Sequence, residues 1–243
     1  MHQEAQNWIR FKNGNQVLER CSLSEFSAYW SQFYRASPSD DVYLSNIKLD
    51  FGQIYTSSNL RELMRWKAGS QNKKSGEAFA NKIDLSQLNG FRESINSHTS
   101  QIQYELFFNR NLKNLTRSPE SFVWPRFVLH IASPRKIPIF DRHAWRSFRF
   151  LNGEMSSDNL ISSASGSDFW PFVHWVWELE KYVDFSARDL DRALWGFGKE
   201  LEKAATHVKN LHLAASAQIP VAKSCHPGLF HRLSELWNDG MAW

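Results

Sequence analysis

The chain of 243 residues is long enough for one large domain or for two smaller lobes. Its hydrophobic fraction of 42%, with 11 Trp and 18 Phe, is typical of a packed globular protein and excludes a disordered one. The formal net charge of +4 is compatible with a polyanionic partner such as nucleic acid, although many ordinary proteins share it.

Cysteine usage and hydropathy exclude several other classes. The two cysteines, Cys21 and Cys225, have neither CxxC nor Cys/His spacing, so we expect no disulfide framework and no zinc site. The sequence also has no P-loop and no GxGxxG motif, and we expect no cofactor. The N-terminal residues lack the basic and apolar segments of a signal peptide. No run approaches the ~20 apolar residues of a membrane span. We therefore expect a cytoplasmic, soluble protein.

Helical periodicity begins with residues 22–35, whose aromatic side chains recur on one helix face. Ser22 and Glu25 form a capping-box pattern at the start of this helix. A second helix is expected to begin near residues 57–58 and to end towards Gly69. The polar, glycine-bounded stretch 69–76 is interpreted as a mobile or ligand-facing loop.

Further helical patterns are expected over residues 79–83, 88–95 and 102–115. Strand patterns are few, and the candidates are residues 42–44 and 53–55. The sequence therefore predicts a mainly α fold with few or no strands.

The next expected helix covers residues 118–132, with a serine N-cap followed by a proline and a kink or late start at Pro125. A loop at 133–138 follows. Asp141 opens another helix, which ends at residues 152–153.

The C-terminal part contains an expected surface loop at 156–167 and an aromatic helix at 169–183. A serine-capped helix at 186–198 is expected next, with helix continuing over 199–217. A short helix at 229–237 is predicted to dock on the domain.

Asp141 is the strongest candidate for a functional residue. A carboxylate at a helix start is favoured in its ionised form by cap hydrogen bonds and by the helix dipole. Such an anion can stabilise an oxocarbenium-like state in glycosidic bond cleavage, or orient or deprotonate a water. The alternative is a plain helix cap.

The residues around Asp141 resemble a segment of the helix-hairpin-helix DNA glycosylases. In that superfamily a hairpin and a helix lead, through a loop ending in proline and two apolar residues, to the catalytic aspartate. The sequence Ile-Pro-Ile-Phe-Asp-Arg-His at 137–143 matches this pattern, with His143 at a histidine that many members carry. The resemblance implies a two-lobed helical fold, with Asp141 assisting departure of a base and His143 contributing to substrate binding.

Residues 190–199 resemble the closing helix of the 8-oxoguanine-type members, in which a polar residue and an aromatic four positions later hold the flipped base. Asp191 and Trp195 have that spacing, so they share one helix face. The resemblance implies that they bind the base by edge hydrogen bonds and stacking. The alternative for this pair is a cap and a core residue.

Two departures from the family pattern narrow the expected chemistry. The hairpin of the family carries glycines that approach a DNA phosphate, whereas residues 117–123 contain none. Bifunctional members carry a nucleophilic lysine about 20 residues before the aspartate, whereas residues 119–124 contain none. Water is therefore the expected nucleophile.

A second basic and aromatic segment lies at 63–74, and together with the Asp141 segment it resembles bacterial proteins of the 8-oxoguanine glycosylase fold. Trp66 is interpreted as a substrate-stacking residue. The alternative is a core aromatic with solvated lysines beside it. The residues expected to contact DNA phosphates are Arg65, Lys67, Lys73, Lys74, Arg142 and Arg146.

These features predict a single domain of residues 1–243, with possible lobes at about 1–115 and 116–243 and the site between them. The expected function is that of a monofunctional DNA glycosylase in DNA repair, acting by base flipping and base excision. Two alternatives stay open, namely a non-catalytic nucleic-acid-binding module of the same fold and a helical protein-interaction subunit. His130 is predicted to be a buried histidine whose hydrogen bonds are satisfied.

Overall fold

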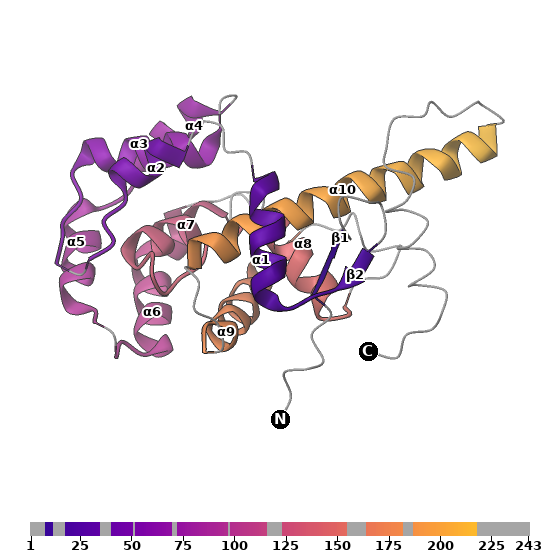
Figure 1. The fold of residues 1–243 in the computed structure, drawn as a ribbon. Helices are drawn as coiled ribbons and strands as arrows, with labels where there is room; N and C mark the ends of the chain where they lie inside the picture. Colours follow the sequence, from indigo (N-terminus) through magenta and orange to yellow (C-terminus); the bar gives the residue numbers. More distant parts are fainter. Residues whose placement is uncertain are drawn as a thin grey trace. The chain divides into compact units, whose positions relative to one another are not determined.

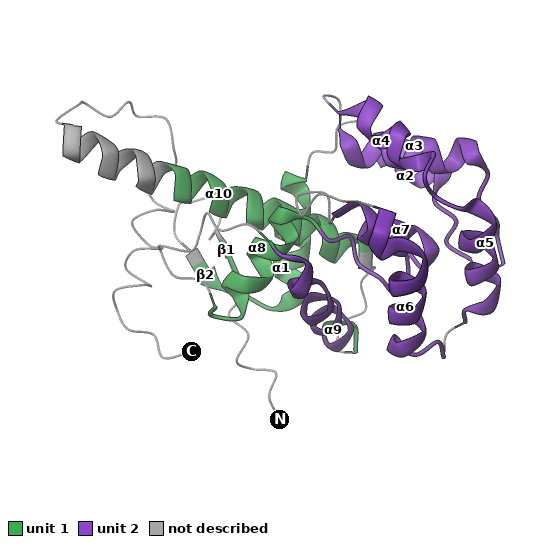
Figure 2. Cartoon of the chain, turned by 180° about the vertical axis from the view of Figure 1, so that it is seen from behind, with its two compact units in different colours: residues 1–34, 141–164, 179–243 green, residues 35–140, 165–178 purple. Residues whose placement is uncertain are grey.

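The structure is a computed structural model in which the protein is mainly helical, with one two-stranded sheet in the described part (Figure 1). The chain forms two compact units, each assembled from separate segments of sequence (Figure 2). Unit 1 comprises residues 1–34, 141–164 and 179–243, and unit 2 comprises residues 35–140 and 165–178. The division differs from the boundary near residue 115 that the sequence suggested. The described residues are 8–11, 18–34, 40–50, 52–69, 72–96, 98–115, 123–154, 164–181 and 187–217.

In its described residues, unit 1 combines a short sheet with three α-helices. Its strands pair antiparallel, with Ile9 opposite Arg20 and Phe11 opposite Leu18. The indole Nε1 of Trp30 donates a hydrogen bond to the carbonyl of Ile9 at 2.7 Å and thereby ties a helix to the sheet. The elements are β1 (Ile9–Phe11), β2 (Leu18–Arg20), α1 (Leu23–Trp30), α8 (Arg142–Leu151) and α10 (Ala187–Ala217).

The core of unit 1 forms around Phe197 of α10. Its ring centroid lies 5.5 Å from that of Phe26, 5.1 Å from that of Trp30 and 5.5 Å from that of Phe150. Gly196 lies against the backbone of Trp30, so α1 and α10 pack closely there. This packing holds α10 beside α8, which carries Asp141 at its start.

The described residues of unit 2 form helices and their connections. The chain continues from α6 (Gln101–Phe107) through a π-helical turn (Phe108–Leu112) into a 3-10 turn (Lys113–Leu115). The helices are α2 (Asp40–Asn46), α3 (Ser57–Ala68), α4 (Lys73–Ala80), α5 (Leu85–Ser94), α6 (Gln101–Phe107), α7 (Val123–Ala132) and α9 (Phe169–Glu180).

Helix α7 provides much of the core of unit 2, since its residues from Pro125 onward are all buried. His130 is 3% exposed, and both of its ring nitrogens are hydrogen bonded. Its Nε2 lies 2.7 Å from the hydroxyl of Tyr43, and its Nδ1 lies 2.5 Å from the carbonyl of Ile137. The prediction of a buried, satisfied histidine is confirmed.

Most predicted helices are confirmed in kind and position. The capping box of Ser22 and Glu25 is present at the start of α1. Helix α3 ends at Ala68, with Gly69 at a positive φ of 71° in the C-cap position. Helices α5 to α8 lie close to their expected ranges, α9 ends at Glu180, and α10 is one continuous helix.

The strand predictions were wrong. Residues 42–44 lie in α2, and residues 53–55 form no strand. The interpretation of residues 69–76 as a loop was also wrong in part, because α4 begins at Lys73. Gly76 marks a close contact between α4 and α3, since a Cβ there would lie 2.5 Å from the carbonyl oxygen of Met64. Only glycine allows α3 and α4 to approach so closely.

Some predictions lie outside the described residues. They are the serine cap and proline at 118–119, the loop at 156–163, the cap at Ser186 and the short helix at 229–237.

Candidate active site

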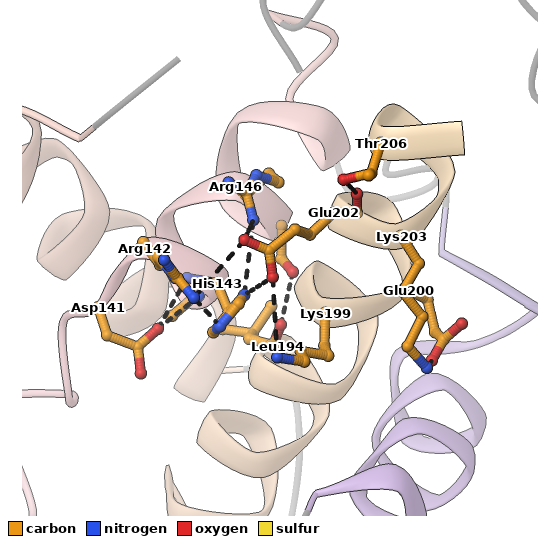
Figure 3. Close-up of polar contacts among 12 residues, drawn as sticks. Asp141, Arg142, His143, Arg146, Leu194, Lys199, Glu200, Glu202, Lys203 and Thr206 are labelled. Atoms are coloured by element: carbon orange, nitrogen blue, oxygen red, sulfur yellow. Dashed lines mark hydrogen bonds and ion pairs between the residues drawn. The ribbon is translucent and has the colours of Figure 1, made fainter. Parts of the chain in front are cut away.

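Asp141 caps the N-terminus of α8 (Figure 3). Its Oδ1 accepts hydrogen bonds from the backbone N–H groups of His143 and Ala144, both at 2.9 Å. The predicted N-cap is therefore confirmed. The side chain is half-buried, and the two hydrogen bonds together with the helix dipole favour the ionised carboxylate. A carboxylate fixed in this way can stabilise a positive charge that develops beside it.

A second carboxylate, that of Glu202, faces α8 from α10 (Figure 3). Its Oε1 lies 3.6 Å from Nη2 of Arg142 and 3.7 Å from Nη1 of Arg146. Its Oε2 lies 3.8 Å from Nδ1 of His143 and 3.8 Å from Nζ of Lys199. Three cationic side chains therefore surround this one carboxylate. We call Arg142, Arg146, Lys199 and Glu202 the Glu202 cluster.

His143 is buried beside this cluster, and its burial lowers the pKa of the imidazole below the ordinary value of 6.5. The carboxylates of Asp141 and Glu202 oppose this effect. The Nε2 atom lies 3.4 Å from Nε of Arg142, and Nδ1 lies 3.5 Å from Nη1 of Arg146. Because burial disfavours the charged form, the neutral imidazole is favoured at pH 7, and only one of its two ring nitrogens can then accept a hydrogen bond from a guanidinium group.

Arg146 is the buried cation of the cluster, with 5% of the residue exposed. Burial lowers the pKa of its guanidinium, and the carboxylate of Glu202 raises it. A guanidinium nevertheless stays charged at neutral pH, so its burial needs an anion nearby. Glu202 meets this need from the neighbouring helix, and it thereby couples α10 to α8.

The half-buried ring of Trp195 lies beside the cluster. Its centroid is 5.1 Å from that of Tyr34 and 5.2 Å from that of His143, both in edge-to-face arrangements. The ammonium of Lys199 lies 5.7 Å from the centroid of the Trp195 ring. An aromatic surface and a cationic one are therefore adjacent, as the binding of a nucleotide requires.

Asp191, the other residue predicted to hold a base, is buried and forms an ion pair. Its Oδ2 accepts a hydrogen bond from Nη1 of Arg188 at 3.0 Å. The same guanidinium donates from Nη2 to the hydroxyl of Tyr34 at 3.0 Å. Asp191 and Trp195 thus share one helix face, as predicted, and Arg188 and Tyr34 link them.

Trp66 belongs to unit 2 and is 7% exposed. Its ring centroid lies 4.8 Å from that of Tyr43, and 5.9 Å from that of Phe127 in a stacked arrangement. This burial favours the interpretation of Trp66 as a core aromatic, because a stacking platform for a base needs an exposed ring face.

The other basic residues predicted to contact DNA in this segment also belong to unit 2. Arg65 joins α3 to α4, since its Nε lies 2.5 Å from Glu77 and its Nη1 lies 2.5 Å from Glu62. Lys67 lies 5.5 Å from the centroid of the Phe127 ring. The exposed side chains of this group are those of Lys73 and Lys74, in the first turn of α4.

Lys199 and Glu202 were not among the predicted site residues, although helical periodicity points to both. Positions 195, 199 and 202 continue the face of α10 that begins with Asp191, at steps of four, four and three residues. Extending that face by two turns would have added both residues to the candidate site. Their pairing with Arg142 and Arg146 joins distant parts of the sequence, so no local pattern indicates it.

In the described part of the chain, no group of three or more His, Cys, Asp or Glu side chains could hold a metal ion. None of the helices in those residues combines the length and the apolar character needed to cross a membrane. Comparisons with protein-family models, with curated proteins and with solved structures find no match to this chain. Its function is therefore inferred from the chemistry of its own residues.

Proposed function

We propose that this protein is a DNA glycosylase-like hydrolase that removes a flipped, damaged or modified base. The observation that carries the proposal is the carboxylate of Asp141, held at the start of α8 by two backbone N–H groups. An anion in such a position suits the stabilisation of an oxocarbenium-like sugar. The resemblance of residues 118–146 to helix-hairpin-helix DNA glycosylases supports the same role.

In the proposed reaction a water oxygen forms a bond to C1′ of the sugar while the bond between C1′ and the base nitrogen breaks. The bonding electrons leave with the base, which then takes up a proton. Asp141 stabilises the positive charge on the sugar and accepts one proton from the attacking water. Residues 119–124 contain no lysine, so the proposed chemistry needs no Schiff base.

Side chains of α8 and α10 support the binding functions that we propose for this reaction. The half-buried ring of Trp195 offers a stacking surface, and the carboxylate of Asp191 lies one turn before it on α10. Arg142 is exposed and lies next to Asp141, where it can contact a DNA phosphate.

The test is a base-release assay on DNA duplexes that each carry one damaged or modified base. The wild-type chain is compared with Asp141→Asn, which keeps a good N-cap while removing the charge. The matched control is Asp84→Asn, because Asp84 is the N-cap of α5 and accepts a hydrogen bond from the N–H of Gln87. We expect release by the wild type and by the control, and loss of release in Asp141→Asn. Release that survives in Asp141→Asn would disprove the mechanism.

The ion pair between Asp191 and Arg188 favours a second candidate, a nucleic-acid-binding module without base excision. A carboxylate engaged by a guanidinium is less available to the edge of a base. This candidate predicts salt-dependent DNA binding that Asp141→Asn leaves unchanged. Fluorescence anisotropy at about 50 mM salt measures that binding, because phosphate contacts are strong at low salt. No binding there would favour a protein-interaction subunit instead.

A further inference from the structure

The carboxylate of Glu202 makes long contacts with three cationic side chains and with the imidazole of His143. All four contacts with Arg142, His143, Arg146 and Lys199 lie between 3.6 and 3.8 Å. Charge-assisted hydrogen bonds between a cationic nitrogen and a carboxylate are typically about 2.7–2.9 Å long. Glu202 therefore lies between the cations without approaching any of them to the distance of a hydrogen bond.

The reason is a mismatch between the donors and the acceptor. Oε1 is shared by the two guanidinium groups, and Oε2 is shared by the imidazole of His143 and the ammonium of Lys199. A carboxylate has two oxygens, so each oxygen of Glu202 faces two of these groups at once. Inorganic phosphate has four oxygens in a tetrahedral arrangement, and guanidinium groups bind phosphate in a bidentate manner.

The exposure of the side chains fits a site that a ligand can enter. Arg146 forms the inner wall, with 6% of its side chain exposed. Lys199 and Arg142 form the outer part, with 39% and 65% exposed. Glu202 itself is 28% exposed, and its flexible side chain can turn away towards solvent. Glu202 and Asp141 both raise the pKa of the Arg146 guanidinium, and the effect of Glu202 is the larger of the two.

We infer that Arg142, Arg146 and Lys199 form a binding site for one phosphate-type oxyanion, at the position where the carboxylate of Glu202 now lies. Trp195 adjoins the site through its contact with Lys199, so the oxyanion of a nucleotide chain is a fitting ligand. The suggestion that the bound oxyanion is a phosphate of the DNA backbone rests on the proposed function. The binding of an oxyanion at this position can be tested separately, with inorganic phosphate.

The experiment measures the binding of inorganic phosphate to the full chain by titration calorimetry and by the shift in unfolding temperature. Ionic strength is held constant with sodium chloride, so that general screening does not change. Glu202→Gln is compared with Glu200→Gln, because Glu200 lies on the same helix and pairs with Lys203 instead. Lys199→Gln is compared with Lys203→Gln, because Lys203 lies on the same helix and pairs with Glu200 instead of Glu202.

We expect Glu202→Gln to bind inorganic phosphate roughly three- to tenfold more tightly than the wild type, because the competing carboxylate is gone. Lys199→Gln weakens binding by a similar factor, while Glu200→Gln and Lys203→Gln stay within about twofold of the wild type. If Glu202→Gln is less stable in chloride, phosphate restores its unfolding temperature more than that of the wild type.

The inference is overturned if Glu202→Gln binds phosphate no more tightly than Glu200→Gln, or if Lys199→Gln binds it as well as Lys203→Gln. A second arm uses short single-stranded and duplex DNA and identifies the source of the phosphate. Tighter DNA binding by Glu202→Gln indicates a backbone phosphate, whereas an effect confined to inorganic phosphate indicates a free ion. Base release is scored separately with Asp141→Asn, so failure of the enzyme proposal and failure of the oxyanion site give different results.

Discussion

Gly198 of α10 lies directly against the main chain of His143 in α8. A Cβ added to Gly198 would come within 2.6 Å of the carbonyl carbon of His143 and within 2.9 Å of its Cα. Carbon atoms are at their optimal separation at about 3.5–4.0 Å, so the two helices would have to move apart. The close approach of these residues therefore positions the side chains of α10 beside Asp141.

We predict that Gly198→Ala lowers the free energy of unfolding by about 2–3 kcal/mol, because the added methyl group overpacks the contact between α8 and α10. Urea denaturation of the full chain measures the change. Gly90→Ala is the matched control, since Gly90 lies in α5 with nothing within 4 Å of its added Cβ. Its replacement should stabilise the protein by about 0.5–1 kcal/mol. Equal stabilities of the two variants would contradict this view of the packing.

Arg92 supports unit 2 from a buried position, with 1% of the residue exposed. Its guanidinium donates hydrogen bonds of 2.8–3.0 Å to five backbone carbonyls, those of Lys48, Asp50, Gln53, Ile131 and Ala132. We predict that Arg92→Met costs about 3 kcal/mol or more, because buried carbonyls lose their donors.

The matched control for Arg92 is Arg61→Met on the exposed face of α3, which should change stability by about 0.5 kcal/mol or less. Chemical denaturation of both variants gives the comparison. A loss in Arg92→Met no larger than that in Arg61→Met would show that solvent satisfies the five carbonyls equally well.

Local sequence patterns were sufficient to predict those features that depend on interactions between residues close together in the sequence. The caps at Ser22 and Asp141 were predictable because a cap side chain bonds to backbone groups two or three positions later. Tyr43 illustrates the opposite case. Its segment has a strand-like composition, yet it lies in α2, where its ring packs on Trp66 and His130. Packing between distant segments overrode the local preference.

The candidate site could also be predicted from the sequence only in part. Asp141 and His143 stand in one short motif, so the sequence identified them together. Glu202 lies about sixty residues later, and its interaction with Arg146 exists only because α10 packs on α8. The short strands β1 and β2 were missed because three residues are too few to display an alternating pattern.

His143 should make stability depend on pH. Burial lowers the pKa of its imidazole in the folded protein below the ordinary value of 6.5. As pH falls through about 6.5, the unfolded chain takes up a proton at this position while the folded protein does not, so stability decreases. Above that range both states are neutral, and this contribution to stability is fully retained.

We predict that His143→Gln flattens the decline in unfolding free energy between about pH 7 and pH 5.5. Denaturation curves at several pH values measure the slope. The control is His98→Gln, which replaces an exposed histidine of unit 2 and should keep the slope of the wild type. An unchanged slope in His143→Gln would mean that other groups cause the decline.

Asp141 combines a structural role with the proposed catalytic one, and two substitutions separate them. Asparagine is as good an N-cap as aspartate, whereas alanine loses about 1 kcal/mol of helix stability. We therefore expect the unfolding free energy of Asp141→Asn to stay close to that of the wild type and that of Asp141→Ala to fall. Both variants should lose base release, because both lack the carboxylate. If Asp141→Asn retained base release and Asp141→Ala alone lost it, Asp141 would act only as a helix cap.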